Sequence, residues 1–118
     1  MPDINPVQIE EAIRECASRI SRGVTVCSNT YSAFLEADRA YDRAYAQAYL
    51  AADGPAHERK YHAELATGDA REARDLADVT YRHAERTAKA LDAELRAWQS
   101  VGASVRQMYG VAGRGEGA

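Results

Sequence analysis

The chain has 118 residues, enough for one small domain, and its 15 basic and 18 acidic side chains give a formal net charge of -3 at pH 7. These charges are mixed along the chain, which does not favour a broad electrostatic grip on nucleic acid. No apolar run approaches the roughly 18 residues that a membrane span needs, and residues 1–10 carry acids instead of a secretion signal, so we expect a cytoplasmic protein without a membrane anchor.

The first predicted helix covers about residues 6–52. Asn5 followed by Pro6 is a start signal, because Asn can cap the first free amides and Pro is tolerated at the first helical position. Gly23 and the β-branched residues after it weaken the middle, so this arm could break near Gly23 and give three helices. Seam residues recur with the alternating four-and-three spacing of a coiled coil: Ile9, Ile13, Cys16, Ile20, Val24, Cys27, Tyr31, Phe34, Asp38, Tyr41, Tyr45 and Ala48.

A turn at residues 53–55, Asp-Gly-Pro, separates this arm from a second predicted helix over about 56–109. Asp69 with Glu72 three residues later resembles a capping box, so a kink or a restart at Gly68 is an alternative. Residues 110–118 are Gly-rich and are expected to form a flexible tail. The second seam is Ala66, Ala70, Ala73, Ala77, Thr80, Ala84, Ala88, Leu91, Leu95, Trp98, Gly102, Val105 and Tyr109.

The two patterns predict an all-α fold, a long antiparallel helical hairpin resembling a coiled coil, with residues 1–109 as a single helical domain. Each series contains one doubled four-residue step, 16-20-24 and 80-84-88, which we interpret as two facing stutters. The predicted register places Ile9 near Trp98 and Tyr31 near Ala77. Apolar residues beside the stripe predict self-association into a homo-oligomer: Leu35, Leu50, Leu65, Leu76, Val79, Val101 and Met108.

Residues that could carry catalysis or bind metal are few. Cys16 and Cys27 lie eleven residues apart, roughly 16 Å on one straight helix, which is beyond disulfide reach. His57 and His62 are five residues apart and turn away from each other, unlike the zinc pair of a metalloprotease helix. No Gly-rich phosphate loop and no nucleophile beside a His base occurs. We therefore predict no catalytic residue, no metal site, no cofactor and no enzymatic activity.

A tyrosine ladder, Tyr41, Tyr45 and Tyr49, recurs at intervals of four residues. Aromatic rings beside arginines could stack on the bases of single-stranded nucleic acid. An aromatic stripe at helical spacing is more often part of a core or an interface, and nearby aspartates neutralise this surface. Direct contact with nucleic acid is therefore possible but not favoured.

The segment 95–109 differs from the rest of the second arm because it contains no acid and holds the only tryptophan. Tryptophan and arginine contribute a large share of the binding energy of interfaces. The predicted partner-binding residues are Arg96, Trp98, Gln99, Arg106 and Tyr109. The alternative is that this segment packs against Ile9 and Ile13 of its own chain or of a twin chain.

The sequence from Tyr41 to Arg106 resembles a group of small proteins of tailed phages and prophages, most of them without an assigned activity. The residues that carry the resemblance are Ala44-Tyr45, Ala48-Tyr49-Leu50, Gly54-Pro55, Glu58-Arg59, Ala63-Glu64-Leu65-Ala66, Arg74-Asp75-Leu76-Ala77, Leu91, Leu95, Gln99-Ser100 and Arg106. Members are often encoded among early genes for DNA replication and recombination. The resemblance implies a viral origin and a protein of that setting, without supplying a catalytic residue.

The leading functional hypothesis is a non-enzymatic phage protein that acts by binding. It would be a self-associating hairpin that serves phage DNA replication or recombination, or docks on a protein of that machinery, in the cytoplasm of the bacterial host. One alternative is an inhibitor of a host enzyme or defence complex, because a small acidic protein can imitate nucleic acid. A second alternative is a structural or assembly bundle of the virion.

Overall fold

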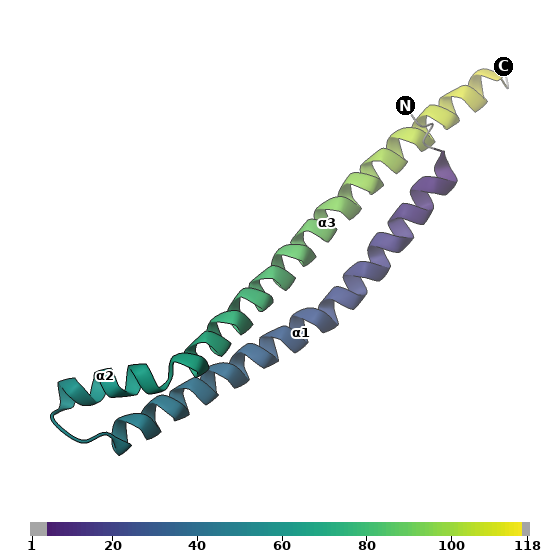
Figure 1. The fold of residues 1–118 in the computed structure, drawn as a ribbon. Coiled ribbons are helices and arrows are strands. Elements are labelled where there is room, and N and C mark those ends of the chain that lie inside the picture. The colour runs from purple at the N-terminus through teal and green to yellow at the C-terminus, as the bar shows by residue number, and fades with distance from the viewer. Residues whose placement is uncertain (1–4, 117–118) are drawn as a thin grey trace. The chain divides into compact units, whose positions relative to one another are not determined.

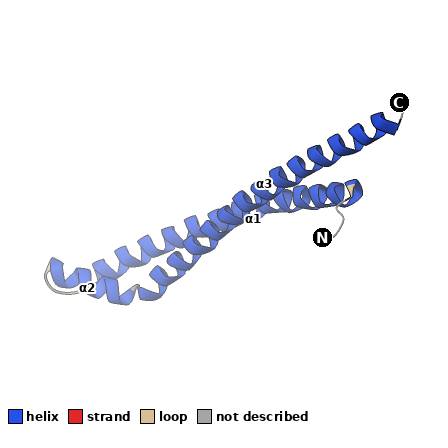
Figure 2. Cartoon of the chain, turned by 90° about the horizontal axis from the view of Figure 1, so that it is seen from above, coloured by secondary structure: helices blue, strands red, loops and turns tan. Residues whose placement is uncertain are grey.

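A computed structural model describes the backbone of residues 5–116 and the side chains of residues 5–110. It contains three helices, α1 (Pro6–Ala51), α2 (Ala56–Ala66) and α3 (Gly68–Glu116) (Figure 1). The described residues include no strand, as the view in Figure 2 shows. The predicted all-α helical hairpin is confirmed, and the limits of the first arm and of the turn agree with the prediction to within about one residue.

The start of α1 is a reciprocal cap. The amide of Gln8 donates to Asn5 Oδ1 at 2.9 Å, and the amide of Asn5 donates to Gln8 Oε1 at 3.3 Å. This arrangement is a capping box, which satisfies two free amides at once. Asn5 is therefore the predicted cap, and Gln8 is its partner.

The turn between α1 and α2 depends on Gly54, whose φ of 101° lies in the region that favours glycine. A Cβ atom at Gly54 would also lie 2.9 Å from Glu58 Oε2. The first turn of α2 holds the loop in place, because Arg59 Nε donates to the Gly54 carbonyl at 2.9 Å. The Asp-Gly-Pro turn is thus fixed both by backbone conformation and by a side-chain bond.

The third helix arises at Thr67 and Gly68, whereas α1 passes through Gly23 without a break. Thr67 lies outside helical geometry with φ -111° and ψ 16°, and its hydroxyl donates to the Ala63 carbonyl at 2.6 Å. Thr30 and Thr80 make the same kind of bond within unbroken helices, so the break at Thr67 reflects that bond together with Gly68, a poor helix former, which follows at once. A single interior glycine such as Gly23 costs only about 1 kcal/mol, which is too little to end a long helix.

Thr67 also takes the cap position that the sequence had suggested for Asp69. The Thr67 carbonyl accepts the first bond of α3, from the amide of Arg71 at 3.0 Å. Asp69 lies inside the first turn of α3, where a carboxylate stabilises the positive end of the helix dipole.

α3 also ends later than predicted. It runs to Glu116, six residues past the expected end at Gly110. Gly54 is the glycine with positive φ in the described chain, so Gly110 adopts no left-handed cap and the helix continues. The flexibility of the tail, residues 110–118, stays a prediction, and residues 117–118 lie outside the described residues.

Burial along each arm follows an uninterrupted four-and-three pattern, so the two predicted stutters are wrong. In α1 the buried and half-buried series is Ile9, Ile13, Cys16, Ile20, Gly23, Cys27, Thr30, Phe34, Ala37, Tyr41, Ala44 and Ala48. In α2 and α3 it is Ala63, Thr67, Ala70, Arg74, Ala77, Tyr81, Ala84, Ala88, Leu91, Leu95, Trp98, Gly102 and Val105. Val24 is instead 65% exposed, and Ala66, Ala73 and Thr80 are exposed.

By their contacts the helices form two compact units, one made of residues 1–24 and 86–118 and the other of Thr25–Glu85. In the first unit the core is apolar and includes Ile9, Cys16 and Leu91, each at most 5% exposed. Cys16 Sγ donates to the Leu91 carbonyl at 3.5 Å, and Arg19 and Glu94 form an ion pair of 3.6 Å at the edge. The single helical domain expected from the sequence therefore stays a prediction.

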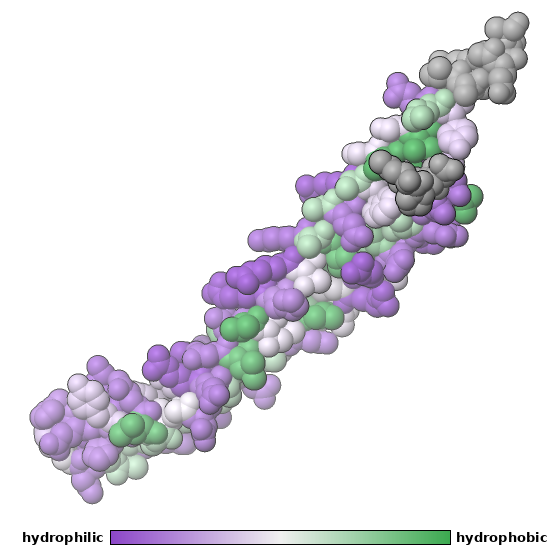
Figure 3. Space-filling view, turned by 45° about the horizontal axis from the view of Figure 1, so that its top comes forward, coloured by the Kyte–Doolittle hydropathy of each residue, from purple (hydrophilic) through white to green (hydrophobic). Residues whose placement is uncertain are grey.

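The second unit packs the later half of α1 against α2 and the start of α3, and its interior is small and polar. Ala63, Thr67 and Ala84 are its buried residues, and Tyr31 and Tyr81 bring their ring centroids to 5.0 Å. No buried side-chain nitrogen or oxygen lacks a hydrogen-bond partner in the described part of the chain. Figure 3 shows that polar side chains dominate the visible surface, with apolar residues in separate spots.

The register differs from the predicted one by one helical turn in both units. Ile9 lies against Gly102 instead of Trp98, and Tyr31 meets Tyr81 instead of Ala77. The reason is at the end of α1, where Ala51 shares a depression with His62 of α2. The first turn of α2 therefore extends past the end of α1, and the second arm uses more residues to come alongside.

Candidate functional site

The first unit contains a shallow groove of about 280 Å³ between the start of α1 and α3. Its floor is apolar, made by Ile9, Ile13 and Val105 together with the backbone of Gly102. Pro6 also lines the groove. The floor can accept an apolar side chain, because burying such a group removes apolar surface from water on both partners.

Polar residues form the rim of this groove. Glu10 comes from α1, and Gln99 and Arg106 come from α3. None of the ion pairs shown among the described residues involves Glu10 or Arg106. The groove therefore offers one carboxylate, one guanidinium and one amide to an incoming group, on opposite walls of an apolar floor.

The groove exists because of Gly102. A Cβ atom there would approach Ile9 Cγ2 to 3.2 Å and Ile13 Cδ1 to 4.0 Å. With hydrogen in place of that carbon, α1 and α3 come close enough for Ile9 to be buried beside the backbone of α3. The two neighbouring isoleucines then leave an open apolar floor next to the close contact.

The structure brings two of the five predicted partner-binding residues together. Gln99 and Arg106 line the groove. Trp98 is half-buried at a seam position of α3. Gly102, one turn further along the same segment, lies against Ile9 of its own chain.

The other two predicted residues lie away from the groove. Arg96 is exposed, and ten residues of helix place it about 80° around α3 from Arg106. Tyr109 lies on the seam side of α3 beyond Val105 and is 60% exposed.

Sequence reasoning missed the α1 wall of the groove. Ile9 and Ile13 were identified as seam residues, but Glu10 was not singled out. The sequence feature that could have identified Glu10 is weak. An acid immediately after a seam residue flanks the seam, and flanking charges commonly meet charges on the opposite helix.

In the second unit the predicted tyrosine ladder forms as expected along α1. The ring centroids of Tyr41 and Tyr45 are 6.3 Å apart and those of Tyr45 and Tyr49 are 6.5 Å apart. One face of Tyr41 is already occupied, because the guanidinium carbon of Arg74 lies 4.5 Å from its centroid. The rings are half-buried, and Tyr41 has only part of its surface left for a stacked base.

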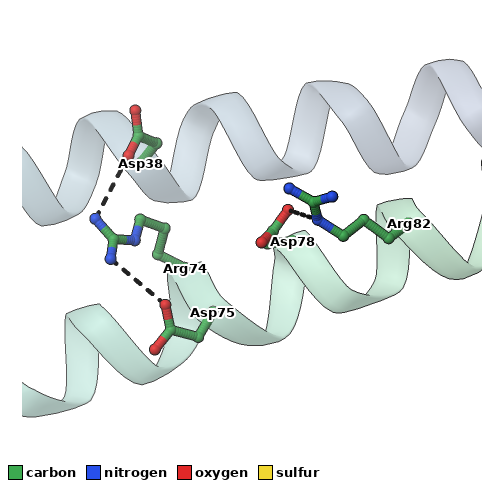
Figure 4. Close-up of polar contacts among 5 residues, drawn as sticks. All are labelled: Asp38, Arg74, Asp75, Asp78 and Arg82. Carbon is green, nitrogen blue, oxygen red and sulfur yellow. Dashed lines mark hydrogen bonds and ion pairs between the residues drawn. The ribbon is translucent and has the colours of Figure 1, made fainter.

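Arg74 is held by two carboxylates as well as by the ring. It lies 3.8 Å from Asp38 across the hairpin and 3.4 Å from Asp75 on its own helix (Figure 4). Further along α3, Arg82 pairs with Asp78 at 3.0 Å. Arg74 is thus neutralised locally, and its charge is less available to a phosphate backbone.

Two side chains have a raised pKa. Burial raises the pKa of the Cys16 thiol, with the Glu94 carboxylate adding to the effect. Burial also raises the pKa of Tyr81, and the Glu85 carboxylate acts in the same direction. Both shifts keep the group protonated, so neither makes a nucleophile or a general base at neutral pH.

A cation site is not formed by the residues that the structure describes, since no group of three His, Cys, Asp or Glu side chains comes together there. The depression at the end of α1 is lined mainly by alanines, with Asp53 and His62 as its polar members. The cluster of His57, Glu58, His62 and Glu64 does not close around a common point.

Comparisons with protein families, with characterised proteins and with solved structures find no match to this chain. Within the described residues, none of the helices has a stretch apolar enough, over sufficient length, to cross a membrane.

Proposed function

We propose that the chain is a non-enzymatic phage or prophage protein that acts by binding other proteins. The observation that carries this proposal is the groove of the first unit, with an apolar floor and one charge of each sign on its rim. Its volume of about 280 Å³ is just below the roughly 300–1,000 Å³ of small-molecule sites. It suits an anchoring side chain of a protein partner.

The occupant that fits best is a partner helix with one apolar anchor. A helix laid along a groove presents its anchor to the floor and its flanking residues to the two walls. Arg106 would then face an acid of the partner, and Glu10 a base. Gln99 can donate to and accept from the partner backbone at the edge.

The resemblance of residues 41–106 to small phage proteins supports placing the partner in phage DNA replication or recombination, in the cytoplasm of the bacterial host. Arg74, which lies over the Tyr41 ring, is held by two carboxylates, and this favours a protein partner over a nucleic acid stacked on that ring. Self-association accompanies this function in our proposal, because large apolar residues of both units are exposed.

A pair of arginine variants tests the groove. Arg106→Glu reverses a charge on the rim, and Arg96→Glu makes the same change on the same helix away from the groove. Affinity-tagged variants would be expressed in phage-infected host cells, and captured proteins identified by mass spectrometry. We expect a phage replication or recombination protein to be captured by the parent chain and by Arg96→Glu, and lost with Arg106→Glu.

The opposite outcomes would refute the assignment. Loss with both variants, or with neither, would mean that the groove does not select the partner. Capture of a host nuclease or of a defence-complex subunit would replace the proposal with host inhibition. Circular dichroism of both variants should show unchanged helicity, because both arginines are exposed.

A further inference from the structure

α3 carries a second stripe of residues on the side away from the seam. Its members within the second unit are Asp69, Glu72, Leu76, Val79 and His83, all exposed. Leu76 and Val79 are 66% and 63% exposed, although they are adjacent on one helix face. The five residues of the stripe recur at the alternating three-and-four spacing by which one helix packs along another.

The charges along this stripe are arranged about its centre. Two acids, Asp69 and Glu72, precede the apolar pair, and the base His83 follows it. Glu72 stands four residues before Leu76, and His83 stands four residues after Val79. Further along α3, Arg86 is spaced from His83 as Asp69 is from Glu72.

Such an order is self-complementary for two antiparallel copies. When the midpoints between Leu76 and Val79 coincide, Leu76 of one copy meets Val79 of the other, and Glu72 meets His83. The imidazole of His83 can donate a hydrogen bond to the carboxylate. A parallel arrangement would place Glu72 against Glu72, so the charges favour the antiparallel one.

The residues beside the stripe permit close approach. Ala73 and Thr80 are small, and the Thr80 hydroxyl already donates to the Leu76 carbonyl at 2.8 Å. Only the methyl group of Thr80 is then left to face a neighbour, so no unpaired polar group is buried by contact. On the other side, Arg82 is bound to Asp78 and has its charge satisfied.

We propose that this stripe of α3 is the contact between two copies of the chain, packed antiparallel about a two-fold axis near residues 76–79. This inference rests on the self-association included in the proposed function and identifies the surface through which it occurs. The contact uses none of the groove residues. From Glu72 to His83 it covers roughly 16 Å of helix at 1.5 Å per residue. An interface of this length is at the small end of specific contacts, so the dimer should dissociate on dilution.

Charge exchange across the axis provides the test. Glu72→Lys removes the carboxylate that accepts the hydrogen bond from His83, and His83→Glu places two carboxylates against each other; the symmetry repeats each change on both sides of the axis. The double variant Glu72→Lys/His83→Glu places a lysine against a glutamate and restores an attraction, only if the copies are antiparallel. Leu50→Lys is the matched control, because Leu50 is 79% exposed on α1 and lies outside the stripe.

Analytical ultracentrifugation over a range of concentrations would measure the monomer–dimer Kd. We expect each single variant to raise Kd roughly tenfold, the double variant to return it to near the parent value, and Leu50→Lys to leave it unchanged. Circular dichroism checks that helicity is preserved.

A parent chain that is monomeric throughout, or an oligomer that grows beyond two copies, would overturn the proposal. So would unaffected single variants, a double variant that stays weak, or equal weakening by Leu50→Lys. Capture of a partner by the parent chain but not by Arg106→Glu tests the groove separately, so either surface can fail without the other.

Discussion

Two glycines in the seam of the first unit provide a stringent test of its packing, because alanine should have different effects at each. Gly23 lies within α1, and a Cβ atom added there meets nothing within 4 Å. Gly102 lies within α3, and a Cβ atom there would be 3.2 Å from Ile9 Cγ2. Both substitutions gain the same helix propensity, so any difference between them reports the close approach of α1 and α3.

The expected magnitudes follow from this geometry. Replacing an interior helix glycine by alanine stabilises by about 1 kcal/mol when the site has room, so Gly23→Ala should raise the free energy of unfolding by nearly that amount. Gly102→Ala starts from the same gain but must displace Ile9, which is 3% exposed. A displacement of a few tenths of an ångström in a packed seam offsets most of the gain, and we expect a net change near zero.

Thermal and urea unfolding of the two variants, followed by circular dichroism, would measure the difference. One kcal/mol corresponds to roughly 4 °C in Tm for a chain of this size. Equal stabilisation by both variants would mean that Gly102 does not lie against Ile9, and the register of the first unit would be wrong. Destabilisation by Gly23→Ala would show that α1 does not pass straight through that position.

Three further predictions concern the seam. Arg74→Met should leave the free energy of unfolding unchanged or raise it, because a methionine fills the same seam position without desolvating a charge; a loss of more than about 1 kcal/mol in urea unfolding would contradict this. Cys27 should react with a thiol reagent before Cys16, which is 2% exposed and hydrogen-bonded; equal rates in the native protein would refute it. Because the pKa of Tyr81 is raised above 10.0 in the fold, stability should be fully present below about pH 10 and fall as the pH rises further. Tyr81→Phe should make that fall shallower, and parallel pH profiles would count against the shift.

The helices and the turn could be predicted from the sequence because they depend on local chemistry. Asn5 and Pro6 mark a helix start, and Gly54 takes a backbone conformation that other residues rarely adopt. The recurrence of apolar residues then identifies two long arms. Each of these signals acts over a few residues, so tertiary contacts do not alter it.

The residues that form the seam could not be predicted in the same way, because several seam positions hold residues that interrupt the apolar pattern. Thr30, Thr67 and Arg74 are polar seam residues that the apolar pattern passes over. The two false stutters come from choosing Val24 instead of Gly23 and Thr80 instead of Tyr81. Arg74 is accommodated because its stem lies along the seam while its guanidinium reaches Asp38 at the edge. That solution depends on the residue opposite, which spacing alone does not reveal.

The groove could not be predicted from the sequence for a related reason. Gln99 and Arg106 were selected by composition, since their segment has no acid and contains the only tryptophan. Separating them from Arg96 required knowing which side of α3 faces α1. The one-turn change of register, set by the overhang of α2 past the end of α1, decides which residues meet Ile9.

The two units place their apolar residues differently, and this difference connects the two proposed surfaces. In the first unit large aliphatic residues such as Leu91 lie in the seam, and two seam isoleucines also form the floor of the groove. In the second unit the seam holds Arg74 and Tyr81, whereas Leu76 and Val79 are exposed on the far side of the same helix. A hairpin stabilised only by itself gains nothing from that arrangement, because exposed aliphatic side chains contribute no burial. A second copy placed along the stripe buries them without changing the seam, so the second unit should gain stability with protein concentration.

The midpoint of thermal unfolding should therefore rise with protein concentration in the parent chain and stay constant in Glu72→Lys. A midpoint independent of concentration in both proteins would mean that Leu76 and Val79 have no counterpart on another copy.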